Sequence, residues 1–85
     1  MHLKEFKDLK PGTLLRQIQY LNDGESPEVI FVGLVRLDEM VKHIHLSSSD
    51  KWMNTAPPSC FDKILDYKDL SSLQQRQYIN LLTNL

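Results

Sequence analysis

Two closely spaced histidines and a single cysteine are the side chains of this sequence with the widest chemical range. His43 and His45 are separated by one residue, so a strand would place both imidazoles on the same face. Such a pair can bind zinc or another metal that prefers imidazole, but a site also needs a third or fourth ligand. Cys60, Asp50 or His2 could supply one, but nothing in their spacing requires it. We therefore expect two half-exposed histidines on the solvent face of a sheet, and no metal.

Cys60 is the other candidate for chemistry. A thiolate with one of the histidines as its base would be a nucleophile, but no family signature surrounds this residue. Free cysteines are more often buried packing residues. The glycines lie too far apart for a loop that cradles phosphate. The sequence therefore predicts no catalytic residue, no cofactor and no enzyme. A metal- or cysteine-dependent enzyme centred on His43, His45 and Cys60 is a distant third alternative.

Size and charge narrow the class of protein. The 85 residues form one small domain, 1–85, with the 41% hydrophobic and 25% charged composition of an average globular protein. Ten basic and eleven acidic residues give a net charge of -1, which counts against binding nucleic acid by charge alone. One cysteine excludes an internal disulfide and fits a reducing compartment. The charged N-terminal residues and the short apolar runs predict a cytoplasmic protein without membrane contact.

The first half of the chain has the pattern of three antiparallel strands. Residues 13–21 alternate in polarity, residues 29–37 form an almost continuous apolar run, and residues 40–46 make a third short run. Asp23-Gly24 gives the strongest turn signal between them, and Gly33 would allow a bulge. These features predict a small antiparallel meander.

The second half is expected to hold a loop and a helix. Residues 47–59 have no period and contain two adjacent prolines, which is typical of a long loop. Residues 60–67 fit either a strand or a short helix, and the spacing of Phe61, Ile64 and Leu65 favours a helical turn. Ser71 and Gln74 have capping-box spacing, which predicts a helix over 71–84. Its apolar stripe would consist of Leu70, Leu73, Tyr78, Leu81, Leu82 and Leu85.

The segment before the first strand adds a resemblance. Residues 8–13 end in Pro11-Gly12-Thr13, a sequence suited to a type II turn. This segment resembles the start of SH3-like small barrels, in which such a turn leads into the first long strand, and the resemblance covers about the first 46 residues. The predicted fold class is therefore α+β, a small antiparallel meander with a C-terminal amphipathic helix, and the resemblance implies an SH3-like barrel.

Two segments are candidates for contact with another protein. Trp52 and Met53 lie in the long loop, where the tryptophan either plugs the open end of the sheet or anchors a partner. In the helix, Gln74 and Gln77 interrupt the stripe and Ile79 lies outside it, which leaves apolar area for a partner or a homo-oligomer. The leading prediction is a non-enzymatic adaptor, or an inhibitor of a larger machine such as phages and mobile elements encode.

The alternative is a small-barrel module that binds nucleic acid. Cationic and aromatic side chains on a sheet face can contact phosphates and stack on bases. Acidic residues in the intervening turns would oppose such binding. The candidate residues are Arg16, Tyr20, Arg36, Lys42 and His43.

Overall fold

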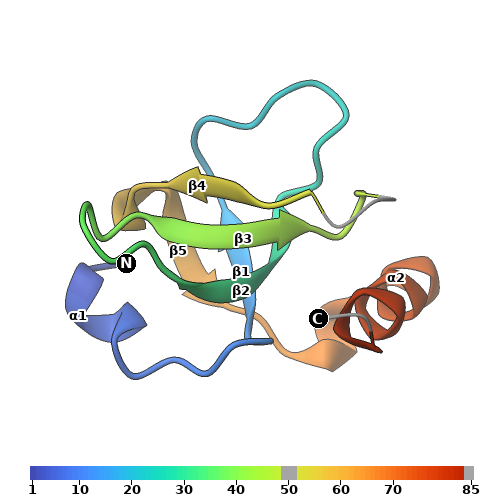
Figure 1. The fold of residues 1–85 in the computed structure, drawn as a ribbon. Helices are drawn as coiled ribbons and strands as arrows, with labels where there is room; N and C mark the ends of the chain where they lie inside the picture. Colours follow the sequence, from blue (N-terminus) through green and yellow to red (C-terminus); the bar gives the residue numbers. More distant parts are fainter. Residues whose placement is uncertain (49–51, 84–85) are drawn as a thin grey trace.

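A computed structural model describes residues 1–48 and 52–83, which form one antiparallel sheet with a helix at each end of the chain (Figure 1). The five strands have the order β4-β3-β2-β1-β5. The helices are α1 (Leu3–Phe6) and α2 (Ser72–Thr83), with short 3-10 turns at η1 (Pro58–Cys60) and η2 (Tyr67–Asp69). The strands are β1 (Leu14–Gln17), β2 (Glu28–Leu34), β3 (Val41–His45), β4 (Asn54–Ala56) and β5 (Phe61–Ile64).

The predicted meander is confirmed, although its strands are shorter than the apolar pattern suggested. β1 pairs with β2 and β2 pairs with β3, both antiparallel. β1 ends at Gln17 rather than at residue 21, and Tyr20 adopts a left-handed conformation with φ of 60° in the loop that follows. The register of β2 and β3 shifts between Phe31 and Gly33, so the bulge expected at Gly33 is present.

The helical turn favoured for residues 60–67 is wrong, because Phe61–Ile64 form a strand. β5 pairs with β1, with Leu15 opposite Ile64, and this pairing supplies the backbone hydrogen bonds that a helical turn would have made internally. The predicted loop 47–59 also contains β4, which forms the outer edge of the sheet beside β3. Residues 49–51 of that loop lie outside the described residues.

The sheet is not closed into a barrel, which corrects the expectation drawn from the SH3-like resemblance. β4 and β5 are the two edges of the sheet, and no pairing joins them in the described part of the chain. These strands have only three and four residues and are linked directly by η1. The turn that carried the resemblance does form, because Gly12 has φ of 99° and Thr13 N–H donates to Lys10 O over 3.2 Å.

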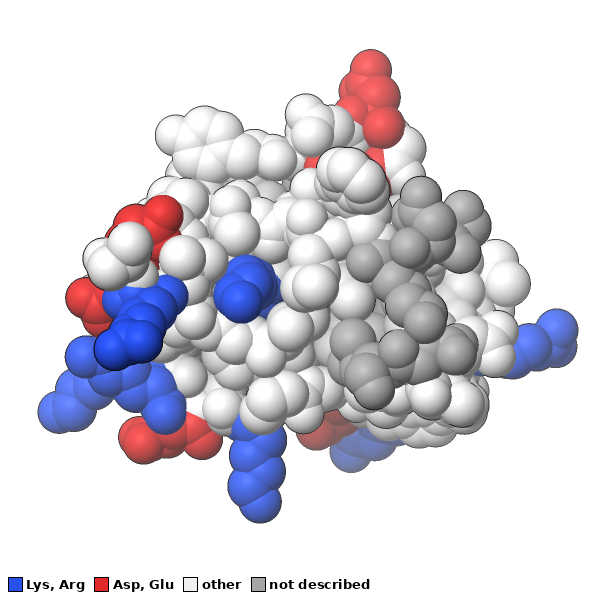
Figure 2. All heavy atoms as spheres, viewed as in Figure 1, with Lys and Arg blue, Asp and Glu red and all other residues white. Residues whose placement is uncertain are grey.

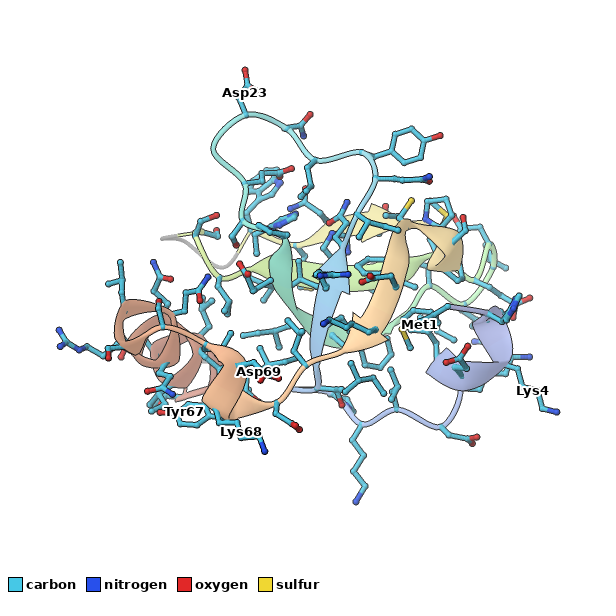
Figure 3. The ribbon with its side chains drawn as sticks, turned by 180° about the vertical axis from the view of Figure 1, so that it is seen from behind. Met1, Lys4, Asp23, Tyr67, Lys68 and Asp69 are labelled. Carbon is cyan, nitrogen blue, oxygen red and sulfur yellow. The ribbon has the colours of Figure 1, made fainter. Side chains whose placement is uncertain are left out.

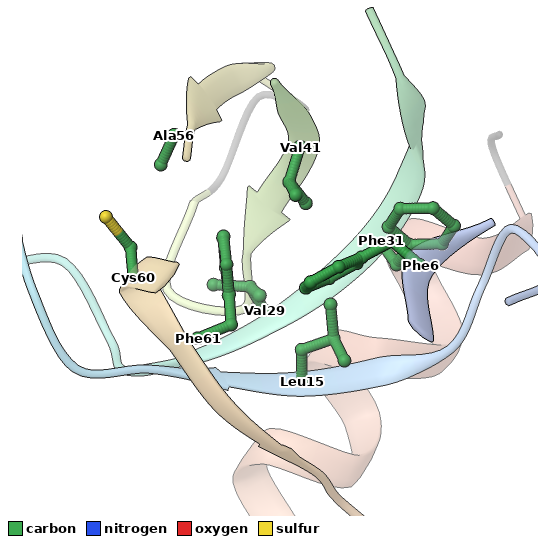
Figure 4. Close-up of a cluster of buried hydrophobic side chains, with 8 residues drawn as sticks. All are labelled: Phe6, Leu15, Val29, Phe31, Val41, Ala56, Cys60 and Phe61. Carbon is green, nitrogen blue, oxygen red and sulfur yellow. The ribbon is translucent and has the colours of Figure 1, made fainter. Parts of the chain in front are cut away.

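One face of the sheet, the inner face, holds a cluster built around aromatic rings (Figure 4). Phe6 of α1 packs against Phe31 and Phe61, with ring centroids 5.9 and 5.8 Å away. These contacts explain how a helix of four residues covers this face. The buried members of this inner cluster are Phe6, Leu15, Val29, Phe31, Val41, Ala56, Cys60 and Phe61.

Helix α2 covers the opposite, outer face and confirms the predicted C-terminal helix within the described residues. Ser71 Oγ accepts from Gln74 N–H over 3.2 Å, and Gln74 Oε1 accepts from Ser71 N–H over 3.0 Å, as the capping box requires. Tyr78 donates from its hydroxyl to Gly12 O over 2.6 Å, which ties the helix to the opening turn. The buried outer cluster consists of Leu14, Ile30, Ile44, Leu46, Leu70 and Leu81.

Candidate functional site

Gln17, the last residue of β1, is the most unusual polar side chain in the described structure. It is only 2% exposed, and its Nε2 donates to Gln19 O over 2.8 Å and lies 3.5 Å from Tyr20 O. Because both neighbours are carbonyls, the nitrogen of the amide must face them and the oxygen must face away. That Oε1 is buried without a hydrogen-bond partner among the described residues. Buried polar atoms in folded proteins almost always have a hydrogen-bond partner, so this oxygen is an exception.

The histidines share a face, as their spacing predicted, but they are buried rather than half-exposed. His43 and His45 point to the inner face, with ring centroids 5.1 Å apart in an edge-on arrangement. His43 also lies edge-on to Phe61, again at 5.1 Å. The reason is that other segments cover this face, because Phe61 of β5 packs on His43 and the Ser26 carbonyl lies 2.7 Å from His45 Nδ1. These contacts join distant parts of the chain, so the prediction of a solvent-facing pair was wrong.

Each histidine is fixed by one backbone carbonyl. His43 Nδ1 lies 3.0 Å from Val41 O, and His45 Nδ1 lies 2.7 Å from Ser26 O. A carbonyl only accepts, so Nδ1 carries the proton in both rings. Burial lowers the pKa of His43, which keeps this ring neutral and leaves its Nε2 as an acceptor. His45 Nε2 lies 3.5 Å from Glu25 Oε2.

These side chains line two adjoining hollows at the end of the sheet where β1 ends. The first, called here the polar hollow, has a volume of about 80 Å³ and is lined by Gln17, Tyr20, Glu25, His43, His45 and Asn54 among others. The second, the outer hollow, has a volume of about 230 Å³ and includes Asp23, Glu25, His45, Trp52 and Asn54. The two hollows share Glu25, His45 and Asn54, so they form one continuous site.

The charge of this site is acidic. Asp23 stands at the tip of the loop between β1 and β2 (Figure 3), and Glu25 lies between the two hollows. No lysine or arginine is among the described residues that line either hollow. On the face drawn in Figure 2, acidic atoms stand at the top of the molecule with no basic side chain beside them, whereas acidic and basic side chains are mixed along its left and lower margins.

Exposed aromatic side chains line the two hollows, and further exposed apolar side chains lie beside them in the sequence. Trp52 is 68% exposed and does not plug the sheet, and Met53 beside it is exposed as well. Tyr20 is 78% exposed and lines the polar hollow from the opposite loop. Ile18 and Leu21 are exposed in the same loop, where the sequence had placed them in a strand. The turn signal at Asp23-Gly24 was the one sequence feature that could have indicated a longer loop, and therefore a shorter strand with Ile18 and Leu21 outside it.

The candidate contact residues of α2 do not form a comparable surface. Gln74 is half-buried and donates to Glu28 Oε1 over 2.8 Å, which makes it a tie between helix and sheet. Gln77 is half-buried, while Ile79 and Leu73 are exposed. Leu73 and Ile79 are six positions apart, which separates them by about 120° around the helix. The exposed apolar area of α2 is therefore split between two sides.

The candidate nucleic-acid residues are dispersed over the fold. Arg16 Nε donates to Asp62 Oδ1 over 2.9 Å. Arg16 and Lys42 lie beside opposite ends of β2, because Arg16 pairs with Glu28 and Lys42 pairs with Gly33. Tyr20 and Arg36 lie in loops at exposed positions, and His43 is buried on the inner face. Tyr20 and His43 both line the polar hollow, but the structure does not bring all five side chains together. Binding of nucleic acid stays a prediction.

The geometry offers little for metal or thiol chemistry. Within residues 1–48 and 52–83, no group of three or more His, Cys, Asp and Glu side chains could hold a metal ion. Cys60 is buried in the inner cluster, and this burial raises the pKa of its thiol. A thiol with a raised pKa is mostly protonated and is a poor nucleophile.

The comparisons with known proteins add no relative. The chain matches no known protein family, no curated protein and no solved structure. Among the described residues, no helix has the length and apolar character needed to cross a membrane.

Proposed function

We propose that this protein is a binding module that contacts a partner protein through the end of the sheet around Trp52. The observation that carries this proposal is that two exposed aromatic side chains from different loops, Tyr20 and Trp52, line the two hollows. Their sequence neighbours Ile18, Leu21 and Met53 are exposed as well. Tryptophan and tyrosine are the residues that most often dominate binding energy at protein interfaces. An exposed apolar group of this kind usually marks such an interface.

The sheet provides the rigidity that a binding surface needs. Gln17 holds the carbonyls of Gln19 and Tyr20, and Tyr20 keeps a left-handed backbone that L-residues rarely adopt. Ser26 and Ser47 join the loop to the end of β3 through two hydrogen bonds of 2.9 and 3.2 Å. A surface held in place before binding loses less conformational entropy when a partner arrives. An adaptor or an inhibitor acting by occupancy, in the cytoplasm, is the role that we propose.

The test compares two exposed apolar side chains at opposite ends of the molecule. The tagged protein is used to capture partners from a lysate of its host, with and without nuclease, and the captured proteins are identified by mass spectrometry. Trp52→Ala should abolish capture of one defined protein. Leu37→Ala is the matched control, because Leu37 is 94% exposed in the turn between β2 and β3 and should leave capture unchanged.

The possible results separate the functions. Capture that survives nuclease and is lost only with Trp52→Ala supports the proposal. Capture that ends after nuclease treatment favours the nucleic-acid alternative, and capture of a second copy of the chain through α2 favours a homo-oligomer. Equal capture by both variants would contradict the proposed surface.

A further inference from the structure

The polar hollow is lined by groups that accept hydrogen bonds. Gln17 lines it, but the amide nitrogen of Gln17 already faces two carbonyls and its Oε1 is buried beneath the surface of the hollow. Neutral His43 uses Nδ1 to donate to Val41 O, which leaves Nε2 as an acceptor. Glu25 contributes a carboxylate whose Oε1 accepts from Asn22 N–H and whose Oε2 lies 3.5 Å from His45 Nε2. The partner that fits these acceptors is therefore a donor.

The charge of the lining shows what kind of donor fits. Glu25 and Asp23 bring two carboxylates to the joined hollows, and the described lining residues include no lysine or arginine. Among the described lining residues, His45 lies beside the Glu25 carboxylate, with its Nε2 3.5 Å from Glu25 Oε2. A partly buried carboxylate favours a cationic donor, because a charge-assisted hydrogen bond is roughly twice as strong as a neutral one.

The polar hollow by itself has a size that suits the end of a side chain. Its volume of about 80 Å³ is several times the roughly 10–15 Å³ that one water needs. It is well below the roughly 300–1,000 Å³ of pockets that enclose complete ligands. Tyr20 at its border and Trp52 in the adjoining hollow add aromatic faces, on which a guanidinium group stacks well.

We propose that the polar hollow receives the guanidinium group of an arginine on the partner protein, an inference that rests on the proposed function. The guanidinium would donate to Glu25 and His43, while the apolar residues around Trp52 bind the neighbouring part of the partner. The planar group with its five donors matches several acceptors at once, which a lysine ammonium does less well. Arginine in this hollow would thus determine which partner binds.

The experiment uses a small probe and does not require the partner. Nα-acetylarginine amide is titrated into the full chain and followed by NMR, with the side-chain amide of Gln17 and the ring signals of His43 as reporters. We expect saturable shifts of both reporters. Nα-acetylcitrulline amide, which has nearly the same shape without the charge, should produce none. Equal shifts with the two probes, or arginine shifts that spare both reporters, would overturn the assignment.

A pair of carboxylate variants tests the role of Glu25. Glu25→Gln should weaken arginine binding by roughly tenfold or more, since hydrogen bonds to charged groups contribute about 1.5–3 kcal/mol. Glu39→Gln is the matched control in the turn at the other end of the β2–β3 hairpin, and it should bind as the parent does. Unchanged binding by Glu25→Gln would contradict the proposal. If Glu25→Gln fails to fold, the citrulline comparison on the parent chain decides the question.

The two proposals can fail separately. Loss of partner capture with Trp52→Ala, together with full capture by Glu25→Gln, would keep the binding surface and reject the arginine. Arginine shifts at Gln17 and His43 in a protein whose capture does not depend on Trp52 would keep the arginine site and reject the proposed surface.

Discussion

His43 is a titratable group that the fold holds in its neutral form. Burial lowers its pKa, the Val41 carbonyl opposes this by accepting from Nδ1, and nearby His45 adds to the lowering. In the unfolded chain the same imidazole takes up a proton near its ordinary pKa of about 6.5. Below that pH the unfolded state binds more protons than the folded state, so the free energy of unfolding falls as the solution is acidified.

We therefore predict that acidification from neutral pH through about 6.5 destabilises the protein, and that His43→Gln reduces this loss. Urea unfolding at a series of pH values on both sides of about 6.5 measures this loss of unfolding free energy. His2→Gln, at an exposed position, is the control and should keep the pH dependence of the parent. The same dependence in His43→Gln would show that other groups are responsible.

At the level of single residues, the sequence predicted the sheet face to which a side chain points better than it predicted whether that side chain is buried. The spacing of His43 and His45 correctly placed both rings on one face, because alternation follows from strand geometry alone. Their burial depends on contacts with Phe61 and Ser26, which lie in other segments of the chain and which no local pattern reveals. Trp52 and Met53 were singled out by type, but Gln17 was not, because its significance lies in an orphaned oxygen that only the structure shows.

Among the elements, α2 depends on a narrow row of contacts with the sheet. Leu81 is buried in the outer cluster, whereas Leu73 on the same helix is 64% exposed. Leu81→Ala should lower the free energy of unfolding by about 2–5 kcal/mol, and Leu73→Ala should change it by less than about 0.5 kcal/mol. Urea denaturation followed by circular dichroism measures both. Similar values for the two variants would show that the helix is not docked in this way.

The contrast between α2 and β5 shows what a local pattern can predict. The helix has twelve residues, enough for its 3.6-residue period and its capping box to predict it, although Leu73 of the expected apolar stripe is exposed. β5 has four residues, and the same positions of Phe61 and Ile64 fit a helical turn. Residues 61–64 form a strand rather than a helical turn because they pair with the free edge of β1, which is distant in the sequence. Closure into a barrel likewise depended on the pairing of β4 with β5, which the short edge strands do not make.

For the whole molecule, the inner and outer clusters are two faces of the same strands. β1, β2 and β3 each contribute residues to both, so neither cluster can open while the other remains intact. We predict a single cooperative unfolding transition for the whole chain, with a free energy of roughly 4–13 kcal/mol for a domain of this size.

Cys60 and α2 provide independent probes of this transition. Cys60 is the only cysteine and is fully buried in the inner cluster, so its modification by a thiol reagent reports when that face opens. Far-ultraviolet circular dichroism reports the helix on the outer face. The urea midpoints of the two signals should coincide. Modification of Cys60 at urea concentrations that leave the helix intact would contradict cooperative unfolding.

The neighbouring positions of β1 and β5 have a consequence for the newly made chain. Leu15 pairs with Ile64, so the ribosome must add more than half of the sequence before β1 can meet its second partner. At synthesis rates of roughly 5–20 residues per second, this interval lasts on the order of 2–10 s. During that time β1 can pair with β2 but presents an uncovered edge on its other side, which is the kind of surface that invites pairing with another chain. Emergence of β5 ends this exposure, and its arrival also delivers Phe61 to the inner cluster.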